Sequence, residues 1–451
     1  MGIETRSQLP VALQLSERVP ALRLDHLPPE VLEVARHCLL DWLGCALAGS
    51  REPLTEILTA EVAALEGAAE ATLIGSGRRC TARTAALVNG AAGHALDFDD
   101  THTLMSGHPS APVLPAALAL AQRLDLPGER LLTAFVAGVE VECRVGALLN
   151  PGHYQSGWHA TGTMGTFGAA AACSHLLGLD ADRWGHALGL AGTQAAGLKA
   201  SFGTMAKPLH AGKAAADGLL AATLAAAGFT ANPAVLEAPQ GLAEAAAGGE
   251  LASSLLAGHE DRFLIRDTLF KYHASCYLTH AAINAALALR EQVGPDQVAG
   301  VEVTVAPEVL NVCNITRPGT GLEGKFSLRA TTAMALLGDD TADPRSYSDA
   351  RMADADLVSL RDRVHVTAAD GRASTRATVA VTAGDGRRFT ADEDTGEPAR
   401  DLDRQRERLT AKFYALAEPV LGPARARALH AAVRRIETVS SVRDLLTLTS
   451  L

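Results

Sequence analysis

The sequence predicts a mainly α protein with a large all-helical domain and a smaller α+β domain. Apolar residues recur at helical spacing through most of the first 265 residues. After about Arg266, apolar and polar residues begin to alternate with a period of two, which is typical of strands. Alanine and glycine are abundant while aromatic residues make up only 4%, so we expect helices that pack closely through small side chains.

Three helices of the first domain have ends that can be read from the sequence. One opens at residues 28–30, where proline suits the first turn, and closes at residues 48–49. A second covers residues 181–192, with Asp180 as its N-cap. A third begins at Pro208 and ends near Gly228.

The second domain is predicted from short alternating segments. Val301, Val303 and Val305 alternate with polar residues, and residues 364–367 repeat the pattern. Two further strands are expected at residues 377–382 and 388–390, joined by a turn at Asp385-Gly386, and helices are expected at residues 279–292 and 327–337. The chain becomes helical again from residue 401. We therefore expect an α+β domain of residues 266–400, inserted into a helical domain of residues 1–265 and 401–451.

The charge balance and the apolar segments limit the partners. Forty Lys and Arg residues against 51 Asp and Glu residues give a net charge of −11, and no basic stripe stands out, which argues against nucleic acid. The longest Ala/Leu run, residues 214–229, contains Asp217 and is too short to span a bilayer. The first residues lack a basic start followed by an apolar stretch, so we expect no signal peptide and a cytoplasmic protein.

The seven cysteines are scattered along the chain without a CxxC spacing. The sequence therefore predicts neither a zinc ribbon nor an iron–sulfur cluster. Most of their neighbours are apolar, so we expect buried free thiols in a reducing compartment.

The densest polar cluster is the segment of residues 94–110, which follows a small-residue apolar stretch, residues 85–93. It contains three histidines, three aspartates, two threonines and two serines. A polar cluster that leaves a buried helix is costly to desolvate unless its groups are paired. Such a cluster usually marks a functional site.

Three further polar clusters follow at residues 153–168, 204–213 and 270–280. In the first of these, glycines spaced three apart predict a small-residue helix face and do not fit a dinucleotide fingerprint. His159 lies just before that helix, where an imidazole stays neutral more easily and can serve as a base. The alternative for His159 is a hydrogen-bonded core or capping histidine.

Two lysines in these clusters are candidate anion-binding groups. Lys207 directly precedes Pro208, which predicts an extended backbone for Lys207 at a helix N-terminus that favours carboxylate or phosphate; a solvated surface lysine is the alternative. Lys271 would place the site in the cleft between the domains. Lys213 has the pattern of a solvated or packing residue. Cys276 could be a nucleophile, but no triad spacing supports that role.

Taken together, these clusters resemble the MmgE/PrpD family, which contains 2-methylcitrate dehydratase, cis-aconitate decarboxylase and iminodisuccinate epimerase. The resemblance covers nearly the whole chain. It implies a large helical domain, a smaller α+β lid, a homodimer, and catalysis without a metal or organic cofactor. The matching segments are Asn89-Gly90, residues 97–101, residues 107–110, residues 157–159, Gly165-Thr166, residues 207–210, Lys271-Tyr272 and residues 324–328.

The resemblance also implies a set of site residues. The positions that match the site of cis-aconitate decarboxylase are Asp97, Thr101, His108, His159, Lys207 and Lys271. Tyr154 matches a tyrosine that acts with the Lys-Pro lysine in the epimerase branch, and we assign His280 to substrate binding. Two departures argue against the decarboxylase: the segment between Thr101 and His108 is one residue longer than expected there, and Ala330 stands where the decarboxylase has tyrosine.

The chemistry implied is proton transfer at a carbon beside a carboxylate of a small di- or tricarboxylate. Lys207 and Lys271 would bind carboxylates, with Thr101 donating a further hydrogen bond. His108 and His159 would be base and acid, Tyr154 a second proton carrier, and Asp97 would orient a histidine or a lysine.

The leading function is a lyase of the 2-methylcitrate dehydratase type. The alternatives are an epimerase or isomerase of the iminodisuccinate type, a decarboxylase of the cis-aconitate type, or an inactive helical dimeric binding protein.

Overall fold

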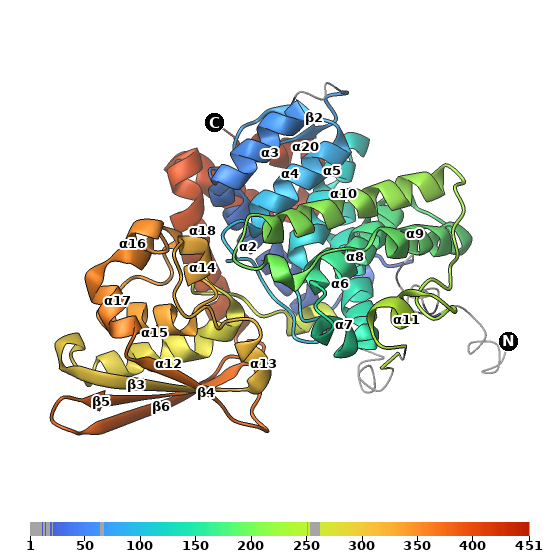
Figure 1. Cartoon of the computed structure of the whole chain (residues 1–451). Coiled ribbons are helices and arrows are strands. Elements are labelled where there is room, and N and C mark those ends of the chain that lie inside the picture. Colours follow the sequence, from blue (N-terminus) through green and yellow to red (C-terminus); the bar gives the residue numbers. More distant parts are fainter. Residues whose placement is uncertain are drawn as a thin grey trace.

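The computed structural model describes residues 11, 14, 19, 21–63, 67–249, 251–252 and 262–450. Within them the protein is mainly helical, with a smaller α+β part, as the sequence predicts (Figure 1). The helices of the first part and its short 3-10 turns are η2 (Leu24–His26), α2 (Pro29–Gly49), α3 (Pro53–Ala63), α4 (Ala82–His94), α5 (Ser110–Leu124), α6 (Gly128–Leu149), α7 (Gly152–Gln155), α8 (Ala160–Leu177), α9 (Ala181–Gln194), η3 (Lys199–Ser201), α10 (Ala206–Ala226), α11 (Leu242–Ala246) and η5 (Leu264–Asp267).

The predicted helix ends agree closely with the structure. Pro29 is the first residue of α2, which ends at Gly49. The Asp180 side chain accepts a hydrogen bond from the Arg183 N–H at 2.9 Å and so caps α9. Helix α10 starts at Ala206, two residues before the predicted Pro208.

The expectation of an almost wholly helical first part missed one small sheet. Strands β1 (Ala71–Thr72) and β2 (Arg79–Cys80) pair in antiparallel fashion. The turn between them contains Gly75 and Gly77, both at positive φ, which glycine adopts without strain. Strands of two residues are too short to show an alternating pattern.

The α+β part is built on a four-stranded sheet of order β4-β3-β5-β6. Strand β3 is parallel to β4 and antiparallel to β5, and β6 returns beside β5 after the predicted turn. Two helices cover the sheet: α12 packs on β5 and β6, and α15 packs on β4. The elements of this part are η6 (Tyr277–Thr279), α12 (His280–Arg290), η7 (Pro295–Gln297), β3 (Val298–Val305), α13 (Pro307–Leu310), α14 (Gly321–Gly324), α15 (Leu328–Leu337), η8 (Pro344–Ser346), α16 (Asp349–Ala353), α17 (Ala355–Arg361), β4 (Val364–Ala368), β5 (Arg376–Ala383) and β6 (Arg388–Asp394).

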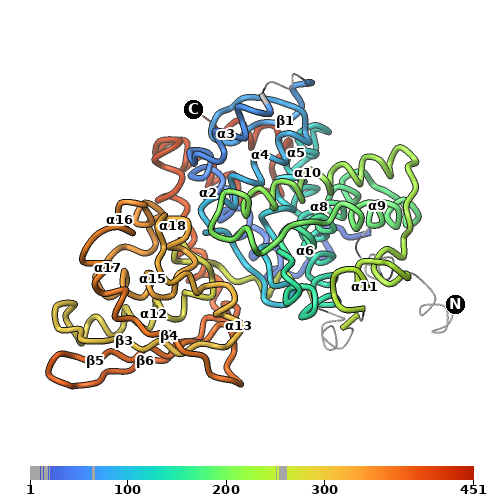
Figure 2. Tube along the Cα trace, viewed as in Figure 1, coloured from blue at the N-terminus to red at the C-terminus, as the bar shows by residue number. Residues whose placement is uncertain are grey.

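The end of the chain is helical again. Helix α18 packs along α2, so the chain returns from the sheet to the first helices (Figure 2). The last elements are α18 (Leu402–Leu421), α19 (Pro423–Val433), η9 (Ile436–Thr438) and α20 (Val442–Thr447). The domain boundaries at residues 265 and 400 stay a prediction. Among the described residues, no helix has both the length and the apolarity needed to cross a bilayer.

Small side chains set the spacing between α4 and α10, the two helices that border the predicted site. A Cβ added at Gly90 would lie 2.8 Å from the Gly212 Cα, and one added at Gly212 would lie 2.1 Å from the Leu87 carbonyl oxygen. Real side chains do not fit at such distances, so these two helices meet backbone to backbone. This close contact uses the alanine- and glycine-rich composition.

Candidate active site

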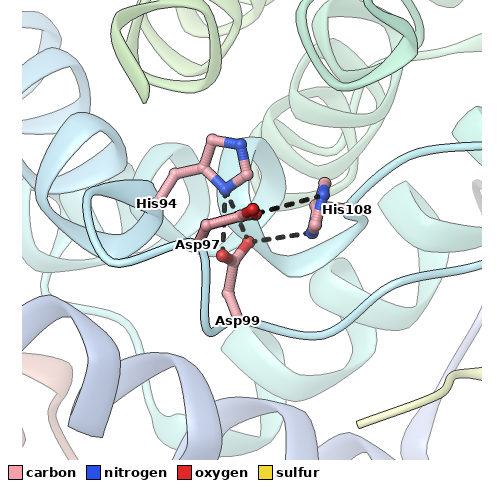
Figure 3. A group of neighbouring side chains, drawn as sticks. All are labelled: His94, Asp97, Asp99 and His108. Carbon is pink, nitrogen blue, oxygen red and sulfur yellow. Dashed lines mark hydrogen bonds and ion pairs between the residues drawn. The ribbon is translucent and has the colours of Figure 1, made fainter. Parts of the chain in front are cut away.

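The polar segment of residues 94–110 forms the connection between α4 and α5 and lies deep in the protein. The Thr81 side chain caps the start of α4, and the helix ends at His94, which is fully buried. Asp97 follows in a left-handed conformation at φ 50°, which turns its carboxylate back toward His94. Figure 3 shows His94, Asp97, Asp99 and His108 gathered around this turn.

Two buried ammonium groups converge on one oxygen of Asp97. The Lys271 Nζ lies 2.7 Å and the Lys207 Nζ 3.0 Å from Asp97 Oδ1. Lys271 also donates to the Asp97 backbone carbonyl at 2.9 Å. Burial alone would raise the pKa of Asp97, but the two ammonium groups outweigh burial and hold that pKa well below its usual range. The predicted pairing of Asp97 with a lysine is thus present twice.

Lys207 reaches Asp97 from the first turn of α10, and its predicted extended backbone is wrong. Met205 is the N-cap, so Lys207 is the second helical residue and Pro208 the third. The first N–H groups of a helix have no intrahelical acceptor, so proline can stand there without breaking a hydrogen bond. Lys207 is 4% exposed, which rules out the solvated surface lysine.

His94 belongs to the same cluster, although it was not predicted as a site residue. Its Nδ1 lies 2.9 Å from Asp99 Oδ1, and its Nε2 lies 2.7 Å from the Lys207 Nζ. An ammonium can only donate, so Nε2 is the acceptor and Nδ1 carries the proton that is donated to Asp99. Burial lowers the pKa of His94, which favours this neutral form. The signal available in the sequence was its position, three residues before Asp97 at the end of a buried helix.

His108 presents its Nε2 toward the cluster. Its Nδ1 lies 2.6 Å from the Asp100 carbonyl oxygen, which can only accept, so Nδ1 carries the proton in the neutral ring. Its Nε2, 3.9 Å from Asp97 Oδ1, is then unprotonated. Burial and the nearby Lys271 ammonium hold the pKa of His108 well below its usual range. This geometry suits a general base.

His159 lies at the N-cap of α8, just before the helix as predicted. Its Nδ1 lies 3.1 Å from the Nδ1 of His210, so one of the two rings donates and the other accepts. Burial holds the pKa of His159 well below its usual range and lowers that of His210 to about 4. The His159 ring stacks on His94 with centroids 5.9 Å apart, which brings the second and third polar clusters to the first.

Tyr154, Thr101 and His280 lie outside these direct contacts. Tyr154 packs against the cores of both parts of the protein, and the Lys199 Nζ lies 3.8 Å from the centre of its ring. The Thr101 hydroxyl donates to the Gly107 carbonyl oxygen at 3.0 Å. His280 is buried and lines a separate cavity, and its Nε2 lies 3.4 Å from the Ser275 carbonyl oxygen. The roles assigned to these three residues stay predictions.

A third buried lysine, Lys325, was also missed as a candidate. It lies between α14 and α15 and donates to the Leu96 carbonyl oxygen at 2.5 Å. Burial lowers its pKa to about 8. Lys412 also reaches this turn, because its Nζ donates to the Phe98 carbonyl oxygen at 2.6 Å and pairs with Asp41 at 2.7 Å. The turn of residues 94–99 is therefore surrounded by four buried lysines, Lys207, Lys271, Lys325 and Lys412.

The four residues of Figure 3 also offer atoms at metal-ligand spacing. One ligand atom from each of His94, Asp97, Asp99 and His108 lies within 4.8 Å of the others. However, the Lys207 ammonium already occupies His94 Nε2 and Asp97 Oδ1. The residues in their present arrangement fit two lysine cations better than a metal ion.

The remaining residues of the polar segment stabilise the turn. Asp100 accepts a hydrogen bond from the Ser110 hydroxyl at 2.5 Å, and burial raises its pKa to about 7. The His102 Nε2 lies 2.9 Å from the Leu264 carbonyl oxygen.

Lys213, on the other side of α10, pairs with Asp217 at 2.7 Å. The Lys213 contact agrees with the solvated or packing role expected of this residue.

Two family models match most of the chain. Residues 13–254 match the MmgE/PrpD N-terminal domain, and residues 273–438 match the MmgE/PrpD C-terminal domain. All the site residues described above fall within these ranges except Lys271, which lies two residues before the second match.

The curated relatives that the chain matches are named as cis-aconitate decarboxylases or as proteins like them. The chain is 35% identical over 224 residues to a cis-aconitate decarboxylase-like protein of Aspergillus oryzae, covering 48% of this chain and 46% of that protein. It is 35% identical over 211 residues to the cis-aconitate decarboxylase of Aspergillus terreus, covering 45% and 43%. It is 34% identical over 213 residues to the human cis-aconitate decarboxylase, covering 46% and 44%. The matched region thus spans less than half the length of each relative.

Proposed function

Because the chain belongs to the MmgE/PrpD family, we propose that it is an enzyme that removes a proton from a carbon beside a carboxylate of a small di- or tricarboxylate. The observation that carries this proposal is the convergence of Lys207 and Lys271 on Asp97 Oδ1, beside an unprotonated His108 Nε2. A base and two fixed cations are what the formation of a carbanion next to a carboxylate requires.

The lysines provide the electrostatic stabilisation. Removing a proton from such a carbon adds a second negative charge to the carboxylate, and this dianion is stable only beside fixed positive charge. Lys207 and Lys271 are almost fully buried, where a charge interaction is less screened than in water. Asp97 holds both ammonium groups in place before the substrate binds, so that little reorganisation is needed during the reaction.

His108 is the proposed base. Its Nε2 takes the proton, and the Asp100 carbonyl oxygen keeps Nδ1 protonated and the ring oriented. The imidazolium that results would lie beside Asp97 and Asp99, which are 3.9 Å and 3.5 Å from its two nitrogens. These carboxylates stabilise the charged ring after proton transfer.

His159 is the proposed acid, with Tyr154 as a second proton carrier. If His159 accepts the His210 proton at Nδ1, its Nε2 carries a proton that it can donate. Burial raises the pKa of Tyr154, so its hydroxyl stays protonated and can also donate. Thr101 would hydrogen-bond a substrate carboxylate after its hydroxyl leaves Gly107.

The leading reaction is the elimination of water, as in a 2-methylcitrate dehydratase. His108 takes the proton from the carbon beside the carboxylate, a C=C bond forms, and the C–O bond of the neighbouring carbon breaks. The departing hydroxyl group takes a proton from His159 and leaves as water. Without a leaving group, the same base and acid would instead epimerise the carbon.

Decarboxylation of cis-aconitate is the second candidate, because three of the relatives described above carry that name or a similar one. Ala330 argues against it, since the resemblance places a tyrosine at this position in the decarboxylase. Ala330 lies in the third position of α15 and is fully buried in the α+β core.

Incubation in deuterated water, followed by NMR, tests the reaction class. The substrates are citrate, 2-methylcitrate, cis-aconitate and iminodisuccinate, each in the presence and absence of a chelator. A new C=C bond with loss of water supports the dehydratase, deuterium at carbon with inversion supports the epimerase, and released CO2 supports the decarboxylase. The absence of all three with every substrate would leave the inactive binding protein as the better interpretation.

The matched variants are Lys207→Met and Lys213→Met. Both remove one lysine charge from α10, but only Lys207 contacts Asp97. We expect Lys207→Met to lower kcat/KM by about 10²- to 10³-fold and Lys213→Met to leave it nearly unchanged. Equal activity in the two variants would remove Lys207 from the mechanism.

The homodimer implied by the family is also a proposal. Light scattering on the eluted peak of a size-exclusion column would measure the mass directly. A mass near twice the 46.8 kDa of one chain is expected.

A further inference from the structure

A cavity lies behind the segment that carries Lys271. Its volume is about 440 Å³, and it is lined by the segment of residues 268–284 on one side and by the start of α18 on the other. Its lining residues include Thr268, Tyr272, His280, Asn284, Arg404 and Arg408. The proposed mechanism uses none of them, apart from the predicted role of His280.

The Lys271 segment separates this cavity from the candidate active site. Thr268, Phe270 and Tyr272 line the cavity, whereas the Lys271 side chain points to Asp97. Leu269 pairs with Thr101 through two backbone hydrogen bonds of 2.8 Å, which tie the segment to the polar turn. The same short stretch of backbone therefore borders both spaces.

Two arginines of the cavity have no anionic partner. Arg404 and Arg408 lie one turn apart on α18, and neither forms an ion pair with any residue that the structure describes. Arg406, between them, differs: it pairs with Glu33 and Asp403. The central carbon of the Arg408 guanidinium lies over the Tyr272 ring, 3.3 Å from its centre.

The acidic residues of the cavity are already engaged. The Asp401 carboxylate accepts from the Arg404 backbone N–H at the start of α18, and Glu397 lies 3.8 Å from Arg400. Arg404 and Arg408 are both exposed, and neither of these carboxylates holds them, so their guanidinium groups are open to a ligand.

A half-buried amide in the cavity lining supports the same conclusion. Asn284 uses its Oδ1 to contact His273 Nε2, which leaves its amide N–H groups for another acceptor.

We propose that this cavity is a second ligand site, which binds a small aromatic anion. A carboxylate or a phosphate would pair with Arg404 and Arg408, because the planar guanidinium matches both groups through two parallel hydrogen bonds. The Asn284 amide would donate to one of the remaining oxygens. The ring of the ligand would lie among Phe270, Tyr277 and His280, which also line the cavity.

Isothermal titration calorimetry of the full chain with phenyl phosphate and with benzoate tests this proposal. Arg404→Gln is the first variant, since it does not disturb the Arg408–Tyr272 contact, and Arg404→Gln/Arg408→Gln is the second. Arg427→Gln on α19 is the matched control, because Arg427 is an exposed arginine that does not line the cavity. Lys207→Met reports binding of the probes at the candidate active site.

We expect the wild type to bind at least one probe. Affinity should fall about tenfold in Arg404→Gln and further in the double variant, while Arg427→Gln and Lys207→Met keep wild-type affinity. Tighter binding of phenyl phosphate assigns the site to phosphates, and tighter binding of benzoate assigns it to carboxylates. No binding of either probe, or a loss only in Lys207→Met, overturns the proposal. The readout is binding alone, so it does not depend on the proposed reaction.

Discussion

The Lys207 ammonium lies 2.7 Å from His94 Nε2, across 113 residues of sequence. Because Asp99 fixes the other nitrogen of the ring, this contact extends a chain of hydrogen bonds from a buried carboxylate to the lysine. His94 therefore acts as a positioning residue that aims Lys207 at Asp97. This geometry leads to the first of four predictions.

Replacing His94 should misplace Lys207 without removing its charge. We expect His94→Leu to lower kcat/KM by about 10- to 100-fold, as for other residues that orient a functional group through one hydrogen bond. His94→Asn, which keeps a polar group near Lys207, should recover part of the loss. Steady-state kinetics with the substrate identified by NMR measures both. Equal kcat/KM values for His94→Leu and His94→Asn would indicate that His94 has only a packing role.

Asp97→Asn should destabilise the protein. The substitution leaves two buried ammonium groups without their shared carboxylate, and breaking a buried ion pair from one side costs about 3–5 kcal/mol. Asp370→Asn removes an exposed aspartate and should change stability by less than about 0.5 kcal/mol. Urea unfolding followed by circular dichroism gives both free energies. An unchanged midpoint for Asp97→Asn would contradict the pairing described here.

The pH dependence of the reaction should reflect a base of low pKa. His108 must be neutral to accept a proton, so activity is lost as the pH falls through its folded pKa. Burial holds this pKa well below the ordinary 6.5, so kcat/KM should stay constant through pH 6.5 and fall only in more acidic solution. The measurement is a pH profile with a substrate whose carboxylates are ionised throughout. A half-maximum at or above pH 6.5 would exclude His108 as the base.

Asp100→Asn should stabilise the protein in alkaline solution. The folded pKa of Asp100 is raised from 3.8 to about 7 by burial, so the stability that its protonated form contributes is fully present below pH 3.8 and is lost as the pH rises through 7. An asparagine imitates the protonated carboxyl group at every pH. Above pH 7 we expect the variant to be more stable than the wild type by about 2–4 kcal/mol.

Thermal unfolding at matched pH values checks this prediction. The difference in Tm between Asp100→Asn and the wild type should grow as the pH rises from about 3.8 to about 7, and should level off above that pH. A difference that does not vary with pH would mean that Asp100 titrates normally.

The sequence predicted elements whose signals are local. The first turn at Pro29, the cap at Asp180 and the alternating valines of β3 each lie within a few residues, and each was found where expected. The same holds for the polar segment of residues 94–110 as a buried cluster.

Contacts between distant segments were less predictable. The family resemblance gave Lys207 and Lys271, but no spacing in the sequence could show that both reach the same oxygen of Asp97. His94 was missed because its lysine partner belongs to another helix, and Lys325 because a lysine beside Phe326 reads equally well as a surface residue. His280 lines the cavity behind the Lys271 segment, and its assignment to substrate binding stays a prediction.

The backbone contact between Gly90 and Gly212 fixes the distance between α4 and α10, and with it the distances within the charge cluster. The turn of residues 94–99 follows α4, and Lys207 lies on α10. The distance between the Lys207 ammonium and the Asp97 carboxylate therefore depends on the distance between the two helix axes. If a methyl group pushed the helices apart, the added separation would be comparable to the length of these hydrogen bonds. A substitution of either glycine by alanine could therefore weaken the charge cluster while leaving each of its polar residues in the sequence.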